Sequence, residues 1–122
     1  MNKPLENIRL IDLTHMLSGP YAGMILADLG CDTVKVEPPF SGEGTRRLLE
    51  DDPENSIKGM GAYFFTLNRN KRSVAIDLKS DKGLALFYEL VKNADVVLDN
   101  FGAGVTQRLK IDYDTLSAIN PK

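Results

Sequence analysis

The loop after the first predicted strand, Ile8–Leu13, is the first place where this chain could bind a ligand. Residues 14–19 connect that strand to a predicted helix that begins near Pro20. In dinucleotide-binding folds this connection carries the pattern G-x-G-x-x-G, whose backbone accommodates a pyrophosphate. The loop here contains a single glycine, Gly19. We therefore expect it to receive something other than a dinucleotide pyrophosphate in the usual position.

Positive charge is concentrated in the segment Asn68–Arg72, which has three cations in four positions just before a predicted strand. A polyphosphate carries several negative charges, and each charge-assisted hydrogen bond to it contributes on the order of 1.5–3 kcal/mol. The segment therefore fits phosphate binding, and Arg108 on a later predicted helix adds a further cation. The alternative is that these side chains form a solvated surface.

Two further candidates lie where predicted strands end, which is the edge at which open α/β sheets bind ligands. Asn100–Gly102 follows the strand Val96–Leu98, and Phe101 offers either a face for stacking or a side chain for the core. Glu37 ends the second strand at the position that contacts ribose hydroxyls in dinucleotide folds. The missing glycine pattern weakens that interpretation of Glu37.

The remaining reactive side chains do not form a recognisable set. His15 is the single histidine and follows a strand, so it is a candidate for acid–base chemistry, although no serine or cysteine nucleophile accompanies it. No combination of His, Cys and Asp has the spacing of metal ligands, so we expect no metal. Cys31, the single cysteine, is predicted to be a small core residue, and it excludes an internal disulfide framework.

An alternation of strands and helices must position these residues. Predicted strands cover Ile8–Leu13, Thr33–Glu37, Ser73–Leu78 and Val96–Leu98, and Phe40–Gly61 is a long excursion with one short helix. Predicted helices begin at Pro20, after the N-cap Ser80, at Val105 and after Asp112, with a helical turn at Ala62–Leu67. The apolar face of the first helix is predicted from Tyr21, Ala22, Ile25, Leu26 and Leu29. This order predicts an α/β fold with an open parallel sheet.

Composition and length limit the possible classes of protein. The chain has 122 residues, which suits one domain, and a net charge of −2, which argues against sequence-independent nucleic-acid binding. Its longest apolar runs fall well short of the roughly 20 residues that span a membrane. The polar start and the single cysteine predict a cytoplasmic domain that does not associate with membranes.

Several segments together carry a family pattern. In chain order they are Ile11–His15, Gly19–Tyr21, Leu26–Gly30, Val34–Pro39, Asn68–Val74, Ala94–Phe101, Asp112–Leu116 and Asn120–Pro121. In this order they resemble the class III CoA-transferases, the family of formyl-CoA transferase, the carnitine and bile-acid CoA-transferases and the methylacyl-CoA racemases. The resemblance covers nearly the whole chain.

The resemblance implies a fold, a ligand and a partner. It implies that residues 1–122 are the coenzyme A-binding, N-terminal part of a large Rossmann-like domain with helices on both faces of its sheet, in a protein that also has a small domain and forms interlocked homodimers. The positions that it implies for coenzyme A binding are Met16, Leu17, Ser18, Ile76, Asp77, Leu78, Lys79, Asn100, Phe101, Gly102 and Arg108. Some members carry an arginine at the position of Pro38, so one adenine or phosphate contact differs here.

The catalytic group of the family is an aspartate in a segment that follows the match at Asn120–Pro121. None of residues 1–122 is assigned that role, so we expect this stretch alone to have no transferase activity. The resemblance implies transfer of coenzyme A between an acyl-CoA and a small carboxylic acid through aspartyl anhydride and thioester intermediates. The alternatives are an acyl-CoA racemase of the same family and a non-catalytic nucleotide-binding module.

Overall fold

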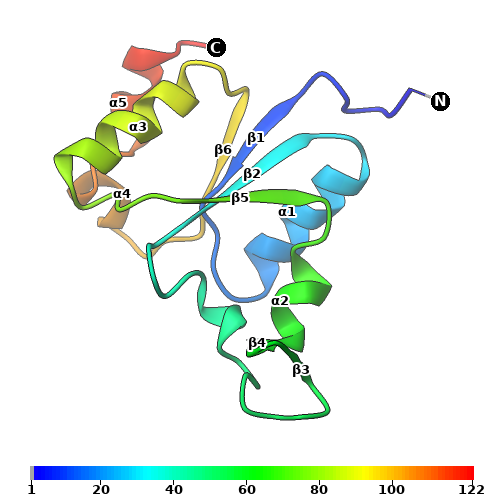
Figure 1. The fold of residues 1–122 in the computed structure, drawn as a ribbon. Coiled ribbons are helices and arrows are strands. Elements are labelled where there is room, and N and C mark those ends of the chain that lie inside the picture. The colour runs from blue at the N-terminus through cyan, green and yellow to red at the C-terminus, as the bar shows by residue number, and fades with distance from the viewer. Residues whose placement is uncertain (1) are drawn as a thin grey trace.

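The computed structural model describes residues 2–122 as a parallel four-stranded sheet with a separate small hairpin (Figure 1). The strands of the sheet are β1 (Arg9–Asp12), β2 (Asp32–Glu37), β5 (Lys71–Ala75) and β6 (Val96–Leu98), in the order β5-β2-β1-β6. All three pairings are parallel, which confirms the α/β class. Their carboxyl ends therefore meet at one edge of the sheet.

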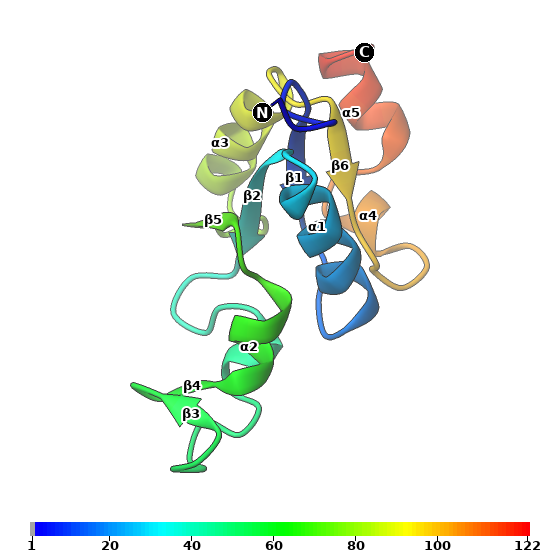
Figure 2. The same ribbon diagram turned by 90° about the vertical axis from the view of Figure 1, so that its right-hand side faces the viewer.

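Helices cover both faces of the sheet. Helix α1 (Ser18–Asp28) connects β1 to β2, and α3 (Asp81–Val91) connects β5 to β6. In Figure 1 the sheet is seen nearly edge-on, with α3 and α5 (Tyr113–Ile119) on its left and α1 on its right. Figure 2 gives the perpendicular view, in which α2 and the hairpin project away from the sheet. The predicted open sheet with helices on both faces is confirmed.

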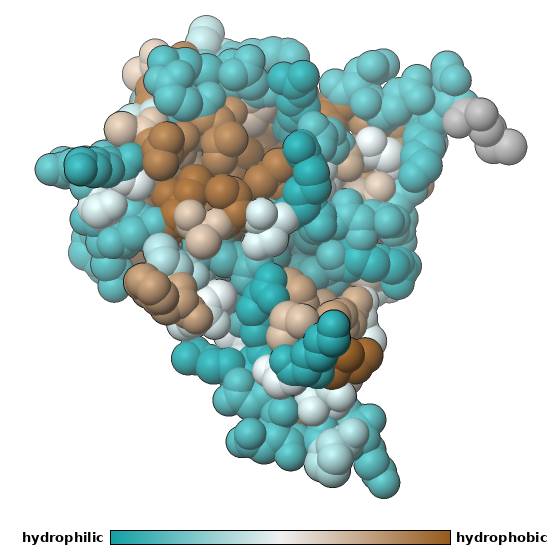
Figure 3. All heavy atoms as spheres, viewed as in Figure 1, coloured by the Kyte–Doolittle hydropathy of each residue, from teal (hydrophilic) through white to brown (hydrophobic). Residues whose placement is uncertain are grey.

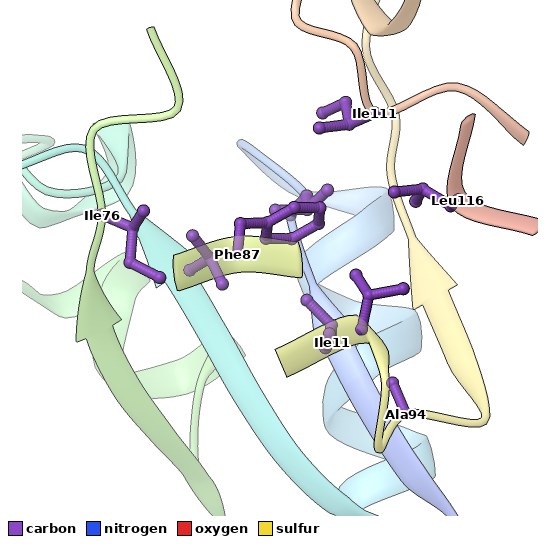
Figure 4. Packing of buried hydrophobic residues seen from close by; sticks show 9 residues of the cluster. Ile11, Ile76, Phe87, Ala94, Ile111 and Leu116 are labelled. Atoms are coloured by element: carbon purple, nitrogen blue, oxygen red, sulfur yellow. The ribbon is translucent and has the colours of Figure 1, made fainter. Parts of the chain in front are cut away.

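The main apolar core lies between the sheet and the pair α3 and α5. Phe87 of α3 is fully buried at its centre, in contact with the cluster that includes Ile11 of β1 and Leu116 of α5 (Figure 4). Figure 3 shows a hydrophobic area on the surface between α3 and β5, bordered by hydrophilic side chains. Leu86 of α3 is 62% exposed.

The later helices were predicted correctly because their signals are local. The Ser80 side chain accepts a hydrogen bond from the Gly83 amide and caps α3. The Asp112 side chain caps α5 in the same way through Thr115. Helix α4 (Val105–Arg108) also begins where predicted.

The excursion after β2 contains several short elements. They are the 3-10 helix η1 (Gly44–Arg46), the hairpin β3 (Ser56–Ile57) with β4 (Met60–Gly61), and helix α2 (Ala62–Leu67). The predicted short helix and the helical turn at Ala62–Leu67 are both confirmed.

Helix α1 differs from the prediction in its start and in its buried face. It begins at Ser18, and it buries Pro20, Gly23, Met24 and Ala27. Residues predicted to be its apolar face are instead exposed: Tyr21 by 53%, Ile25 by 41% and Leu29 by 42%. At Gly23 this inward face has no room for a side chain, because charged groups lie beneath it. A Cβ at Gly23 would lie 2.8 Å from Oδ2 of Asp12.

The third strand of the sheet was predicted two to three residues too late. It runs from Lys71 to Ala75, so residues 76–79 form a connection beyond its end. The register pairs Val74 with Val36 and Ala75 with Glu37 of β2. Lys71 therefore belongs to the sheet, although its charge had placed it in a loop.

Across the described residues 2–122, no helix has the length and apolar character needed to cross a membrane.

Candidate ligand-binding site

A pocket of about 530 Å³ opens at the carboxyl edge of the sheet. Each of the four strands contributes at or just past its end, and α4 closes one side. The lining residues are Leu13, His15, Val36, Glu37, Pro38, Ile76, Asp77, Leu78, Lys79, Phe101, Val105, Arg108 and Leu109. Apolar side chains supply most of this lining, with charged groups among them.

Six of the eleven predicted site residues line this pocket. Four of them form the continuous run Ile76–Lys79, and the others are Phe101 and Arg108. The run is fixed at its start, where the Ile76 amide donates to the Glu37 carbonyl oxygen at 2.9 Å. It is fixed further along by Asp77, whose side chain accepts from the Lys79 amide at 3.0 Å. Because β5 ends at Ala75, this run forms a loop beside the pocket, whereas most of it was predicted to belong to the strand.

The loop after β6 contacts the loop after β1. The Phe101 ring packs against the main core and lines the pocket. The distance between the centroids of the Phe101 and His15 rings is 5.4 Å. Phe101 therefore contributes to the core, as one interpretation expected, and its stacking on a ligand stays a prediction. Asn100 and Gly102 do not line the pocket, but the Asn100 side chain makes two hydrogen bonds to the His15 backbone.

Met16, Leu17 and Ser18 lie outside the lining residues, at the entrance to α1. Met16 and Leu17 are about half exposed, at 49% and 51%. Met16 has a φ of +67°, in the left-handed region that side chains disfavour. The structure thus brings this triplet next to the lining residue His15 without placing it in the pocket.

Two cations of the pocket have no ionic partner within residues 2–122. Lys79 and Arg108 are both exposed and take part in none of the ion pairs there. Their positive charges are therefore available to a ligand at the carboxyl edge of the sheet.

The predicted phosphate-binding cluster at Asn68–Arg72 does not form a common site. Arg69 pairs with Asp28 at 2.6 Å, and Arg72 pairs with Asp32 at 2.5 Å. The Lys71 side chain, 1% exposed, donates to Asp12 Oδ2 at 2.7 Å. Each cation is thus paired with a different carboxylate. Lys71 and Arg72 are separated because successive side chains along β5 point to opposite faces of the sheet.

A buried ionic group lies under α1. Asp12 accepts from Lys71, and Lys35, 1% exposed, lies 3.7 Å from the same Asp12 oxygen. Lys71 also donates to the carbonyl of Pro20 and to Asn68, at 2.8 and 2.9 Å. Burial lowers the pKa of Lys71, and the hydrogen bond to Asp12 opposes that shift.

Glu37 lines the pocket, but its carboxylate is engaged by protein groups. It accepts two hydrogen bonds from Arg46, at 2.7 and 2.8 Å, one from the Ser73 hydroxyl and one from the Glu43 amide. The Arg46 guanidinium in turn lies 3.7 Å from the centre of the Phe64 ring. Glu37 therefore anchors the excursion to β2, and its contact with a ribose stays a prediction.

These bonds change the acidity of Glu37. Burial by itself raises the pKa of this carboxyl, but the hydrogen bonds from Arg46, Ser73 and Glu43 outweigh burial and lower the pKa to about 2. The folded-state pKa is below the ordinary value of 4.5. Glu37 thus stabilises the fold above pH 4.5, and its contribution is lost as the pH falls from there towards 2.

We expect Glu37→Gln to lower the free energy of unfolding at pH 7 by on the order of 3 kcal/mol. The difference from the unsubstituted chain is expected to shrink as the pH falls below 4.5, because protonated Glu37 then resembles glutamine. Urea denaturation at a series of pH values measures this. Glu54→Gln, on an exposed part of the same excursion, is the control. A difference independent of pH would contradict the role given to the Glu37 charge.

Sequence reasoning missed several lining residues. They are Leu13 directly after β1, Val36 near the end of β2, and Val105 and Leu109 in the region of α4. Pro38, directly after β2, also lines the pocket, and the resemblance had marked it as a position where a contact differs. The missed side chains are apolar, so no charge or hydrogen-bonding group marked them as ligand contacts.

Comparison with known proteins identifies the family. The family model described as CoA-transferase family III matches residues 5–122. A formyl-CoA:oxalate CoA-transferase of Bradyrhizobium sp. (strain ORS 278) is 43% identical over 122 residues, which is all of this chain and 28% of that protein. A succinate–glutarate CoA-transferase of Agrobacterium fabrum is 43% identical, over 98% of this chain and 30% of that protein.

The fold agrees with this family. The crystal structure of a CAIB/BAIF family protein from Brucella suis superimposes with a TM-score of 0.88 at 39% identity, covering 98% of this chain and 32% of that one. The chain thus spans less than a third of the length of these relatives. With the family model matching nearly all of its residues, the chain belongs to CoA-transferase family III.

Proposed function

We propose that the pocket at the carboxyl edge of the sheet binds coenzyme A. In this proposal, residues 1–122 are the coenzyme A-binding part of a large Rossmann-like domain. The whole enzyme transfers coenzyme A to a small carboxylic acid. The observation that carries the proposal is a mostly apolar pocket, in a chain of this family, with two cations that have no ionic partner within residues 2–122. The apolar lining suits the adenine ring and the pantetheine arm, and Lys79 and Arg108 suit the phosphates.

The names of the relatives support the substrate class. Relatives are named formyl-CoA:oxalate, succinate–glutarate and acetyl-CoA:oxalate CoA-transferases. Each name describes transfer to or between small carboxylic acids. We extend this class to the present chain, as an acyl-CoA and a free carboxylic acid that exchange one coenzyme A.

The chemistry proposed for the whole enzyme uses a carboxylate nucleophile outside residues 1–122. Its attack on the acyl-CoA carbonyl expels the coenzyme A thiolate and forms an anhydride, which that thiolate then attacks to give an enzyme thioester and the free acid. The role of residues 1–122 is to hold coenzyme A near that nucleophile. We propose that the complete enzyme works as a homodimer and that residues 1–122 alone do not perform the transfer.

The proposal is tested by comparing coenzyme A with pantetheine, which lacks the nucleotide and all phosphates. Calorimetric titration of the protein is expected to show coenzyme A binding at least about tenfold more tightly, because pantetheine forgoes the contacts to Lys79 and Arg108. Equal affinities would contradict the assignment of the phosphates to these cations. Absence of coenzyme A binding would contradict the proposed function itself.

A further inference from the structure

The loop between β1 and α1 is held by side chains from distant segments. At Thr14, the amide donates to Asp12 Oδ1 at 2.9 Å, and the carbonyl oxygen accepts from Lys35 Nζ at 2.8 Å. Thr14, Asp12 and Lys35 are each at most 1% exposed. This end of the loop is therefore fixed by buried charged groups.

The next two residues are held in the same manner. The His15 amide donates to Asn100 Oδ1 at 2.9 Å, and the His15 carbonyl oxygen accepts from Asn100 Nδ2 at 2.8 Å. The Met16 amide donates to Glu43 Oε1 at 2.8 Å. Five successive backbone groups thus bind side chains, and Glu43 holds the last of them.

Glu43 reaches this amide from the excursion, 27 residues along the chain. It is 1% exposed and does not line the pocket. The same carboxylate also accepts from the amide of Thr45, at 3.2 Å, and from its hydroxyl. Every hydrogen bond of the Glu43 carboxylate is therefore internal to the protein.

The charge of Glu43 has a second effect. Lys35 and Lys71 bring two buried cations to this region, against the anions Asp12 and Glu43. The negative charge of Glu43 raises the pKa of Lys71, in opposition to the effect of burial. Removing the Glu43 charge therefore leaves two buried cations with one anion, an effect on stability that is separate from the position of the loop.

The Met16 bond lies where the chain turns into α1. The left-handed φ of +67° needs support, and the half-exposed Met16 side chain supplies little packing. His15, directly before it, lines the pocket and contacts Phe101. The hydrogen bond from Met16 thus sets the path of the loop beside the pocket.

We propose that Glu43 is a positioning residue, whose Oε1 fixes the Met16 amide and thereby the loop that carries the pocket-lining residue His15. The inference rests on the proposed function, because the ligand whose affinity reports the position of the loop is coenzyme A. Glu43 itself does not contact the ligand. Its hydrogen-bonding role is separable from its charge.

Two substitutions make that separation. Glu43→Gln keeps an oxygen that accepts from Met16 but removes the charge, whereas Glu43→Ala removes both. Both variants are expected to unfold at lower temperature. Glu43→Gln should bind coenzyme A within about twofold of the unsubstituted protein, and Glu43→Ala at least about tenfold more weakly. The same substitutions at the exposed Glu54 are the matched control and should change neither property.

Amide exchange of the unsubstituted, ligand-free protein gives a second test that needs no variant. NMR should show the Met16 amide exchanging about a hundredfold more slowly than the neighbouring amide of Leu17, which has no acceptor within residues 2–122. Equal exchange of the two amides would overturn the proposal, and so would equal losses of affinity in Glu43→Gln and Glu43→Ala. A protein that failed to bind coenzyme A would overturn the proposed function, while amide exchange would still decide the role of Glu43.

Discussion

Asp12→Ala is expected to lower the free energy of unfolding by about 3–5 kcal/mol, because it leaves buried ammonium groups without their shared carboxylate. Asp12 is fully buried, 2.7 Å from Lys71 Nζ and 3.7 Å from Lys35 Nζ. The alanine also leaves the amide and hydroxyl of Thr14 without their acceptor. The cost is large because removing one partner exposes the full desolvation penalty of the other.

The control for this prediction is the neighbouring ion pair of Arg72 with Asp32. These side chains are 69% and 48% exposed, so water solvates both charges when the pair is broken. Asp32→Ala is therefore expected to cost less than about 1 kcal/mol. Urea denaturation followed by circular dichroism measures both variants. Similar losses in the free energy of unfolding for Asp12→Ala and Asp32→Ala would contradict the large stabilisation assigned to the buried Asp12 carboxylate.

The parts of the fold predicted correctly are those with local signals. Helices α3 and α5 have capping side chains, Ser80 and Asp112, three residues before the amides that they bind. Strands β1, β2 and β6 are short apolar or β-branched runs with clear ends. Such patterns depend on neighbouring residues alone, so the sequence reveals them.

The errors arose where distant residues decide the outcome. Lys71 is charged and was placed in a loop, but Asp12, 59 positions away, allows it to lie buried within β5. The same charged group bears on the error in α1, because the buried Gly23 lies directly against Asp12 while the larger Tyr21 and Ile25 are exposed. Sequence periodicity identified the helix but could not identify the face that meets the charges.

The candidate site shows the same division. The run Ile76–Lys79 was implied by the family resemblance, and the structure places it in the pocket together with Phe101 and Arg108. The structural partners of Glu37 could not be foreseen, because Arg46 lies in an irregular excursion that gives no periodic signal. Glu43 was missed for the same reason, since its hydrogen bond joins two loops.

The second large effect is expected on coenzyme A affinity. Lys79 and Arg108 are the unpaired cations among the lining residues that the structure describes, and they belong to different elements on the rim of one pocket. Lys79→Ala and Arg108→Ala are each expected to weaken binding roughly tenfold to a hundredfold, if each contacts a phosphate. Because both are exposed, the smaller value is the better expectation for each.

The double variant Lys79→Ala/Arg108→Ala sharpens this test. Two independent contacts add, so the pair is expected to lose at least about a hundredfold in affinity. The control is Arg47→Ala/Lys82→Ala, which removes the same charge from exposed positions outside the pocket. That control should stay within about twofold, since neither side chain lines the pocket and exposed charges are screened at physiological salt.

Calorimetric titration of coenzyme A into the unsubstituted protein and these two double variants tests whether the pocket is the coenzyme A site. We expect saturable binding that falls about a hundredfold in Lys79→Ala/Arg108→Ala and is retained in Arg47→Ala/Lys82→Ala. Circular dichroism of each variant confirms that the fold is unchanged. Equal affinity of both folded double variants for coenzyme A would contradict the claim that this pocket is the coenzyme A site.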